Sequence, residues 1–174
     1  MIGAVGHTDL APLTRKLVEA ELAAVLGRSP GRARGVVRTG AGVPVLFGRA
    51  VRAVGGSLVV VTPTQAMVPA LLPTHDQVAT GELVRLAELV RLLPYDPADR
   101  DACVRADERM IADCRLLLAV WDGSPSNGRD ATAHLVAYAR AHGIPVEVVW
   151  PQGAERLPAQ PHLTPHAGEA GHLR

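Results

Sequence analysis

Short apolar runs alternate along the chain with segments in which apolar residues recur every three or four positions. Leu13, Leu17 and Val18 begin such a helical pattern over 12–26. The run at 58–61 is instead continuously apolar, which is typical of a strand buried on both faces. The whole pattern predicts strands at 2–5, 34–38, 57–61, 90–93, 116–121 and 146–150, and helices at 12–26, 45–54, 81–89, 98–113 and 130–142.

The alternation of strands with helices predicts a mainly parallel sheet that helices cover on both faces. We therefore expect an α/β fold with a single Rossmann-like, doubly wound domain over 1–150. Two segments fall outside the regular pattern. Residues 63–80, which include Pro69 and Pro73, predict a loop or a loosely ordered lid. Residues 151–174 form a Pro- and His-rich C-terminal tail that we expect to lie on the surface or to stay mobile.

Composition narrows the classes of function. The chain has 174 residues, a formal net charge of +1 and only 3% aromatic residues, so neither a general affinity for nucleic acid nor a base-stacking platform is expected. No apolar run reaches the roughly 18 residues that span a bilayer. The first residues also lack the basic region of a signal peptide. We expect a cytoplasmic protein with neither a membrane nor a nucleic acid as partner.

In open α/β sheets, ligands bind beyond the carboxyl ends of the strands, where the strand order reverses. The candidate loops at such ends are 6–9, 39–42, 62–65 and 122–132. Three of them combine glycine with a hydroxyl residue, which lets the backbone approach a phosphate and adds a side-chain donor. The loop at 122–132 is the most informative, because it joins a buried strand to a helix N-terminus. Such a terminus favours an anion, so a phosphorylated or nucleotide-like small molecule is the leading expectation.

The order of these loops is similar to that of one known superfamily. The matching segments are Gly6-His7-Thr8-Asp9-Leu10, Thr39-Gly40-Ala41-Gly42 and Ala119-Val120-Trp121-Asp122-Gly123, followed by Gly128 and Thr132. They resemble the Rossmann-like superfamily, often called SLOG, that joins the lonely-guy phosphoribohydrolases to the DNA-processing (Smf) proteins. The resemblance covers roughly 2–152 and is most specific over 113–150. It implies a site for nucleotides or nucleotide-derived ligands, in an enzyme that cleaves the base from a nucleoside monophosphate or in a sensor or binding module.

The chain departs from that family's pattern in its loops. The usual Gly-Gly-Thr before the last helix is Asp130-Ala131-Thr132 here, and the glutamate that the cleaving enzymes place shortly afterwards is absent. A carboxylate in this loop repels a phosphate, although it can accept a hydrogen bond from a ribose hydroxyl. Many relatives have Gly-Ala-Asp in the second loop, where this chain has Gly42-Val43-Pro44. Acid–base catalysis needs a group within hydrogen-bond reach, so these departures favour binding over hydrolysis.

We therefore expect non-catalytic binding of a nucleotide-derived small molecule at the C-terminal edge of the sheet. Two alternatives stay open, a phosphoribohydrolase-like N-glycosidase with altered residues and a degenerate scaffold that binds a protein partner. No catalytic residue, metal or cofactor is expected. A homodimer also stays open, because the charged helix at 98–113 is typical of a solvated face but also of dimer contacts.

The candidate ligand-binding residues are Gly6, His7, Thr39, Gly40, Gly42, Asp122, Gly123, Gly128, Arg129 and Thr132. We expect the amides of 128–132 and the donor fork of Arg129 to hold a phosphate, and Asp122 to orient a hydroxyl. Two residues have roles of another kind. His7 either contacts the ligand or ties two loops together, and Asp9 is expected to cap the following helix.

Overall fold

The chain folds into seven strands and five helices in the computed structural model, which describes residues 1–29, 31–65, 68–128 and 130–158. In chain order the elements are β1 (Ile2–Gly6), α1 (Pro12–Gly27), β2 (Arg34–Arg38), α2 (Val43–Ala53), β3 (Ser57–Gln65), β4 (Val68–Pro69), α3 (Thr74–Leu86), β5 (Leu89–Pro94), α4 (Arg100–Ala112), β6 (Leu116–Val120), α5 (Thr132–Ala141) and β7 (Val146–Val148). Outside 57–89, the predicted boundaries agree with these to within two residues.

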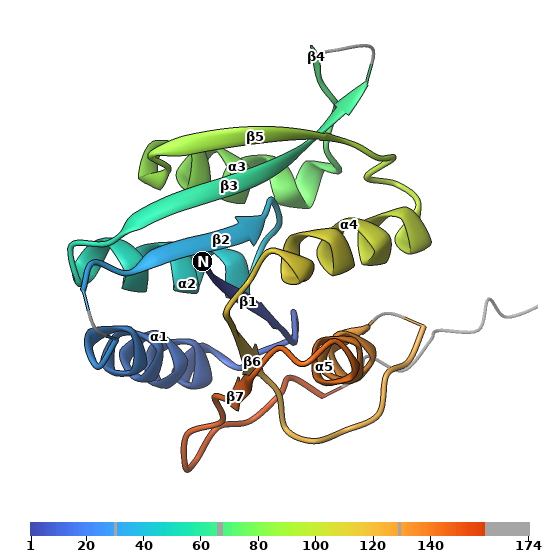
Figure 1. The fold of residues 1–174 in the computed structure, drawn as a ribbon. Helices are drawn as coiled ribbons and strands as arrows, with labels where there is room; N and C mark the ends of the chain where they lie inside the picture. Colours follow the sequence, from blue (N-terminus) through green and yellow to red (C-terminus); the bar gives the residue numbers. More distant parts are fainter. Residues whose placement is uncertain (30, 66–67, 129, 159–174) are drawn as a thin grey trace, which may run out of the picture.

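The strands form one sheet that is parallel except for β4. The chain winds outwards from β1 through β2, β3 and β5, and then returns to place β6 and β7 on the other side of β1 (Figure 1). The strand order therefore reverses between β1 and β6, which is the topological switch point of a doubly wound fold. The predicted Rossmann-like α/β class is confirmed.

Alternate residues of the central strands enter two separate hydrophobic cores. Ile2 and Ala4 of β1 pack with residues of α1, α2 and α3, whereas Val5 packs with residues of α4 and α5. On β6, Leu118 belongs to the first core and Leu117 to the second. Both faces of the sheet are thus buried, which explains the continuously apolar runs in the sequence.

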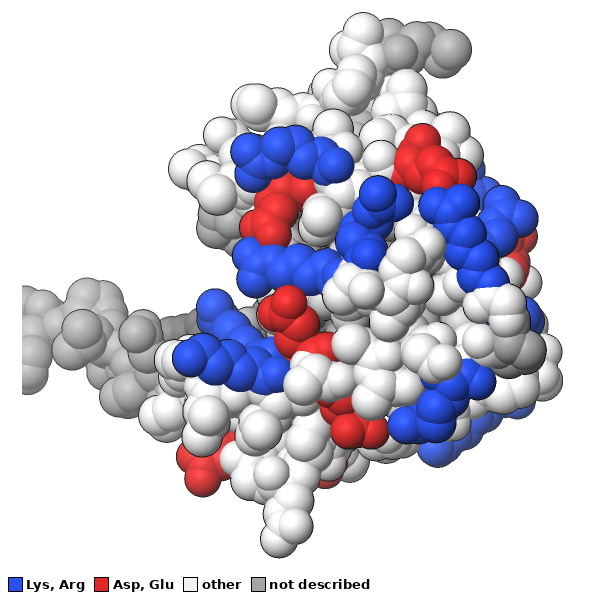
Figure 2. All heavy atoms as spheres, turned by 90° about the vertical axis from the view of Figure 1, so that its left-hand side faces the viewer, with Lys and Arg blue, Asp and Glu red and all other residues white. Residues whose placement is uncertain are grey.

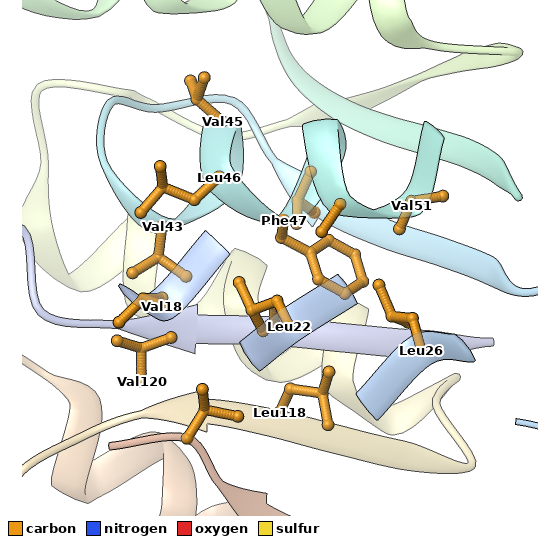
Figure 3. Close-up of a cluster of buried hydrophobic side chains, with 14 of the residues drawn as sticks. Val18, Leu22, Leu26, Val43, Val45, Leu46, Phe47, Val51, Leu118 and Val120 are labelled. Atoms are coloured by element: carbon orange, nitrogen blue, oxygen red, sulfur yellow. The ribbon is translucent and has the colours of Figure 1, made fainter. Parts of the chain in front are cut away.

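Figure 3 shows the first core at close range. Leu22 and Leu26 of α1 point towards the sheet, and Phe47 of α2 packs beside them. Phe47 is the single phenylalanine of the chain and is fully buried. Removal of such a ring costs roughly 3–5 kcal/mol of stability, so this contact between α1 and α2 fixes the helix layer against the sheet.

The prediction of a loop or lid over 63–80 is wrong for the part of that segment that the structure describes. Strand β3 continues to Gln65, and β4 turns back antiparallel against it. Pro69 lies in β4, a strand of two residues at the end of the sheet, where a missing N–H costs little. Helix α3 begins directly after Pro73, which occupies its N-cap position. A proline breaks a helix in its interior but not directly before its first residue, so Pro73 is compatible with the helix that follows it.

The C-terminal segment, as far as residue 158, is hydrogen-bonded to the start of α1. The N–H of Ala11 donates to the carbonyl of Glu155 at 3.1 Å, and the N–H of Leu157 donates to the carbonyl of Asp9 at 2.7 Å. The hydroxyl of Thr14 also donates to the carbonyl of Glu155, at 2.8 Å. This segment therefore lies against the loop that follows β1, at the carboxyl edge of the sheet. The rest of the predicted tail lies outside the described residues.

The opposite side of the molecule, at the amino ends of the strands, is mixed in charge. Figure 2 shows basic and acidic side chains interleaved on this side. Arg28 pairs with Glu147 at 3.2 Å, and Arg32 pairs with Glu88 at 3.4 Å. Such alternation of sign creates no extended field of one charge. Within the described part of the chain, every helix is too short or too polar to cross a membrane.

Candidate functional site

A cavity of about 480 Å³ opens at the carboxyl edge of the sheet. Its walls come from the ends of β1 and β2, the first turns of α2, α3 and α5, and one side of α4. Four of the predicted ligand-binding residues line it, namely Gly6, Thr39, Gly40 and Thr132. The loops after β1, β2 and β6 thus meet around one hollow.

Two of the predicted glycines occupy places in these loops that favour glycine, for different reasons. A Cβ atom on Gly6 would lie 2.6 Å from the backbone oxygen of Val120 and 2.9 Å from Cγ2 of Val43. Gly42, at the N-cap of α2, has a φ of 79°, a conformation that favours glycine. A Cβ on Gly42 would lie 3.6 Å from Cα of Thr8. Gly6 therefore allows close approach of the backbone, whereas at Gly42 only the positive φ favours glycine, and Gly42 does not line the cavity.

His7 ties together the two loops that flank the switch point. Its side chain is 1% exposed, its Nδ1 is hydrogen-bonded to the carboxylate of Asp130, and its Nε2 lies 2.8 Å from Oδ1 of Asp122. Its ring also packs nearly perpendicular to that of Trp150, with 5.8 Å between the ring centroids. Of the two roles expected for His7, the structure shows the loop-tying one, and the residue is not part of the cavity wall.

The three members of this cluster shift one another's pKa values. Burial lowers the pKa of His7, but the hydrogen bonds to Asp130 and Asp122 outweigh it, so the pKa lies above its usual value. Burial raises the pKa of Asp130, yet the hydrogen bonds from His7 and Thr132 bring it down to about 2. For Asp122, burial is likewise outweighed by hydrogen bonds from Ser124 and His7, and the pKa lies below its usual range. The ring of His7 thus lies between two carboxylates that raise its pKa.

Arg156 completes the cluster from the C-terminal segment. Its Nε and Nη2 atoms each lie 2.9 Å from a carboxylate oxygen of Asp9, which makes the pair bidentate. The same guanidinium lies 3.5 Å from the carboxylates of Asp122 and Asp130. The prediction that Asp9 caps α1 is wrong: Ala11 is the N-cap residue and has no side-chain cap, because both oxygens of Asp9 face Arg156. No local signal in the sequence points to Arg156.

Carboxylates of the chain itself accept hydrogen bonds from amides at the cavity. Oδ1 of Asp130 accepts from the N–H of Thr132 at 2.7 Å, at the start of α5. Oδ1 of Asp76 accepts from the N–H of Ala41 at 2.9 Å, in the loop that leads into α2. The N–H of Asp130 donates to the side chain of Asn127 at 2.9 Å. The amides of Asp130 and Thr132, which we expected to hold a phosphate, therefore have partners within the chain.

A partly buried ion pair between Arg38 and Asp107 forms another part of the wall. Nε of Arg38 lies 2.8 Å from Oδ1 of Asp107, and Nη2 lies 3.2 Å from Oδ2. The two side chains are 26% and 13% exposed. Arg38 also donates to the carbonyl of Thr39 at 3.3 Å, and its guanidinium lies 5.9 Å from the centre of the Tyr95 ring. These contacts fix the end of β2 against α4.

One side of α4 faces the cavity, which the sequence analysis missed. The lining residues of this helix are Arg100, Cys103, Val104 and Asp107. Their spacing of three, four and seven residues from Arg100 places them on one helical face. The spacing is visible in the sequence, but the surrounding charges led us to interpret the helix as solvated. Burial raises the pKa of Cys103, so its thiol is protonated at neutral pH.

The other predicted residues lie elsewhere. Three of them, Asp122, Gly123 and Gly128, do not line the cavity. The carboxylate of Asp122 is instead hydrogen-bonded to the ring of His7. Gly123 has a φ of 88° and forms the turn after β6. Arg129 lies outside the described residues. In the ranges that the structure describes, no three His, Cys, Asp or Glu side chains are grouped so that they could hold a metal ion.

Comparison with known proteins gives no family and only weak structural similarity. No family model matches the chain, and no curated protein matches it. Among solved structures, the chain is similar to an uncharacterized protein, ATU2773 from Agrobacterium tumefaciens C58, with a TM-score of 0.23 and 15% sequence identity. The match covers 84% of this chain and 61% of that protein, so the chain spans about three fifths of its length. A similarity at this level carries no argument about function.

Proposed function

We propose that the chain binds a nucleotide-derived small molecule without covalent chemistry, as a sensor or binding module. The cavity carries this proposal. Its volume of about 480 Å³ is within the range of roughly 300–1,000 Å³ that small-molecule sites have. It also lies at the carboxyl edge of a doubly wound sheet, where such folds bind their ligands. Charged and hydroxyl groups converge there beside apolar side chains such as Val104 and Leu135.

The state of the acidic side chains favours binding over hydrolysis. Each carboxylate of the cavity wall accepts a hydrogen bond from the chain: Asp76 from Ala41, Asp107 from Arg38, and Asp130 from Thr132 and His7. A general acid at neutral pH needs a raised pKa, whereas the pKa of Asp130 is lowered to about 2. His7 has both ring nitrogens engaged and lies behind the wall.

We further propose that the chain is a divergent member of the SLOG superfamily. The segments that carry the resemblance fall at equivalent places of the fold, since 6–10 follows β1, 39–42 follows β2, and 119–123 spans the end of β6. Gly128 and Thr132 then precede or begin α5. This placement supports the proposal, because related Rossmann-like proteins build their ligand sites from those loops.

Thermal unfolding with a panel of nucleosides and nucleotides tests the function. A ligand of the folded state that is present at 100 times its Kd adds about 2.7 kcal/mol of stability, so the midpoint should rise. The variant Cys103→Phe fills the cavity and should lose this rise. Arg105→Phe places the same side chain on an exposed position of α4 and should keep it. Chromatography of the same mixtures should detect no free base, and release of a base would instead favour the N-glycosidase.

We also propose that the chain forms a homodimer through the outer part of its sheet. The segment from β4 to the end of β5 carries seven exposed apolar side chains, namely Val68, Leu71, Val78, Val84, Leu89, Val90 and Leu92. Among the described strands β5 pairs with β3 alone, so its outer edge can pair antiparallel with a second copy about a twofold axis. Light scattering should give twice the mass of one chain. A single-chain mass at every concentration would contradict the dimer.

A further inference from the structure

At this cavity, the backbone amides that could bind a phosphate already donate hydrogen bonds to carboxylates of the chain. At the start of α5, the N–H of Thr132 donates to the carboxylate of Asp130. In the loop that leads into α2, the N–H of Ala41 donates to the carboxylate of Asp76. In nucleotide-binding folds of this type, such amides and the dipole of the helix hold the phosphate. Here a carboxylate of the chain accepts the hydrogen bond at both places, and Asp130 also contacts His7 and lies 3.5 Å from Arg156.

Among the residues that the structure describes, the other charged groups of the wall are partly paired with one another. The wall carries the carboxylates of Asp76, Asp107 and Asp130 and the guanidinium groups of Arg38 and Arg100. Arg38 is neutralised by its bidentate pair with Asp107. Arg100 is about half exposed and donates to the carbonyl of Asn127 at 2.8 Å. A ligand that reaches the starts of α2 and α5 therefore meets carboxylate oxygens, which accept hydrogen bonds, in place of the amides of Ala41 and Thr132.

Asp130 in particular is held rigidly as an acceptor. Its side chain is 10% exposed, and His7, Thr132 and Arg156 surround its two oxygens. An ionised carboxylate has about four lone-pair sites and no donor, so it can still accept hydrogen bonds from a ligand. Its partners would be hydroxyl or amino groups, and hydrogen bonds from these groups to a carboxylate are charge-assisted.

We infer that the site selects the nucleoside form of its ligand, with ribose hydroxyl or amino groups donating to Asp76 and Asp130, and disfavours the 5′-phosphorylated form. This inference rests on the proposed function, because it presupposes that the cavity binds a nucleotide-derived molecule. It differs from the expectation drawn from the sequence, in which the loop before α5 holds a phosphate. The inferred ligand is thus a neutral molecule with several hydrogen-bond donors.

Titration calorimetry with adenosine, guanosine, cytidine, uridine and their 5′-monophosphates tests the inference. At least one nucleoside should bind, and about tenfold more tightly than its own monophosphate, because the amides of Ala41 and Thr132 that could hold a phosphate already donate to carboxylates. Removal of the 2′- or 3′-hydroxyl from that nucleoside should weaken binding. A monophosphate that binds as tightly as its nucleoside, or more tightly, would overturn the inference and leave the proposed function intact. If none of the eight compounds binds, the proposed function itself fails.

The variant Asp76→Asn tests the electrostatic cause. It keeps an oxygen that can accept from the N–H of Ala41 but removes the negative charge. Binding of the monophosphate should improve about threefold or more relative to the nucleoside. Asp113→Asn, at the far end of α4 and 53% exposed, is the matched control and should leave the ratio unchanged. An unchanged ratio in Asp76→Asn would overturn the assignment of Asp76.

Discussion

The imidazole of His7 lies 2.8 Å from the carboxylate of Asp122, although the two residues are 115 positions apart in the chain. This contact joins the loop after β1 to the loop after β6, the two loops that flank the switch point of the sheet. The second ring nitrogen holds Asp130, which belongs to the cavity wall. A residue outside the cavity therefore positions one inside it.

The His7 cluster should make stability depend on pH. The pKa of His7 is raised in the folded state, so its contribution is full below the unfolded value of about 6.5 and is lost as pH rises through the folded pKa. The pKa values of Asp122 and Asp130 are lowered, so their contribution is full above about 4 and is lost at lower pH. Urea unfolding should thus show greatest stability between about pH 4 and 6.5.

The control for this prediction is His7→Gln, which removes the titrating ring. Its stability should change less between pH 6 and 9 than that of the wild type. Because this variant could fail to fold, the pKa of His7 should also be measured in the wild type by NMR. A value at or below the ordinary pKa of a histidine would contradict the prediction.

Replacement of Arg156 should raise the pKa of His7 further. Burial and the positive charge of Arg156 both lower that pKa, against the hydrogen bonds that raise it. Arg156→Met removes one of the two opposing effects and keeps the length of the side chain. Loss of the bidentate pair with Asp9 should also reduce stability by roughly 1 kcal/mol, since the pair is partly exposed.

An NMR titration of His7 in Arg156→Met measures this effect. Arg28→Met is a suitable control, because Arg28 pairs with Glu147, is 61% exposed and is not among the groups that shift the pKa of His7. The same pKa in wild type and Arg156→Met would show that Arg156 does not act on the cluster.

Gly6→Ala should destabilise the protein. The sequence predicts Gly6 as a ligand-binding residue, but its close contacts also give it a structural role. The new Cβ would lie 2.6 Å from a backbone oxygen of Val120, which cannot rotate away. Overpacking of this kind costs roughly 1–3 kcal/mol or more. Gly128→Ala is the matched control: nothing lies within 4 Å of its Cβ, so the change should stay within about 0.5 kcal/mol. Equal midpoints of chemical unfolding for the two variants would refute this account of Gly6.

The sequence predicted the fold because each strand and helix carries a local signal. The run at 58–61 and the spacing of Leu13, Leu17 and Val18 are visible without any tertiary contact. The prediction of a loop over 63–80 is wrong because a proline does not break secondary structure at every position. Pro69 lies in a two-residue strand and Pro73 lies before a helix, and both places tolerate proline.

The sequence indicates the place of the cavity, but not the partners of the carboxylates in its wall. The carboxyl ends of parallel strands meet at one edge by topology, which is why Thr39 and Thr132 could be assigned to a common site. The partners of Asp130 could not be found in this way. His7 and Arg156 reach it from opposite ends of the chain, and such pairs leave no periodic pattern in the sequence.

The pair of Arg38 and Asp107 should contribute more to stability than a similar pair on the surface. Arg38 is 26% and Asp107 13% exposed, whereas the bidentate pair of Arg49 and Glu82 is 45% and 28% exposed. Exposed pairs contribute roughly 0–1 kcal/mol, because water and salt screen the attraction. Removal of one partner from a buried pair costs roughly 3–5 kcal/mol, and partial exposure reduces this figure to about 1–3 kcal/mol here.

Two double-mutant cycles measure this difference, one with Arg38→Met and Asp107→Asn, the other with Arg49→Met and Glu82→Gln. The coupling free energy should be larger in the first cycle and should fall less with added salt, since screening acts mainly on exposed charges. Asp107→Asn alone should also leave the guanidinium of Arg38 as an uncompensated cation in the cavity wall. It should therefore strengthen the binding of 5′-monophosphates, whereas Glu82→Gln should not. Equal couplings and equal affinities in both series would show that the cavity does not shield this pair from water.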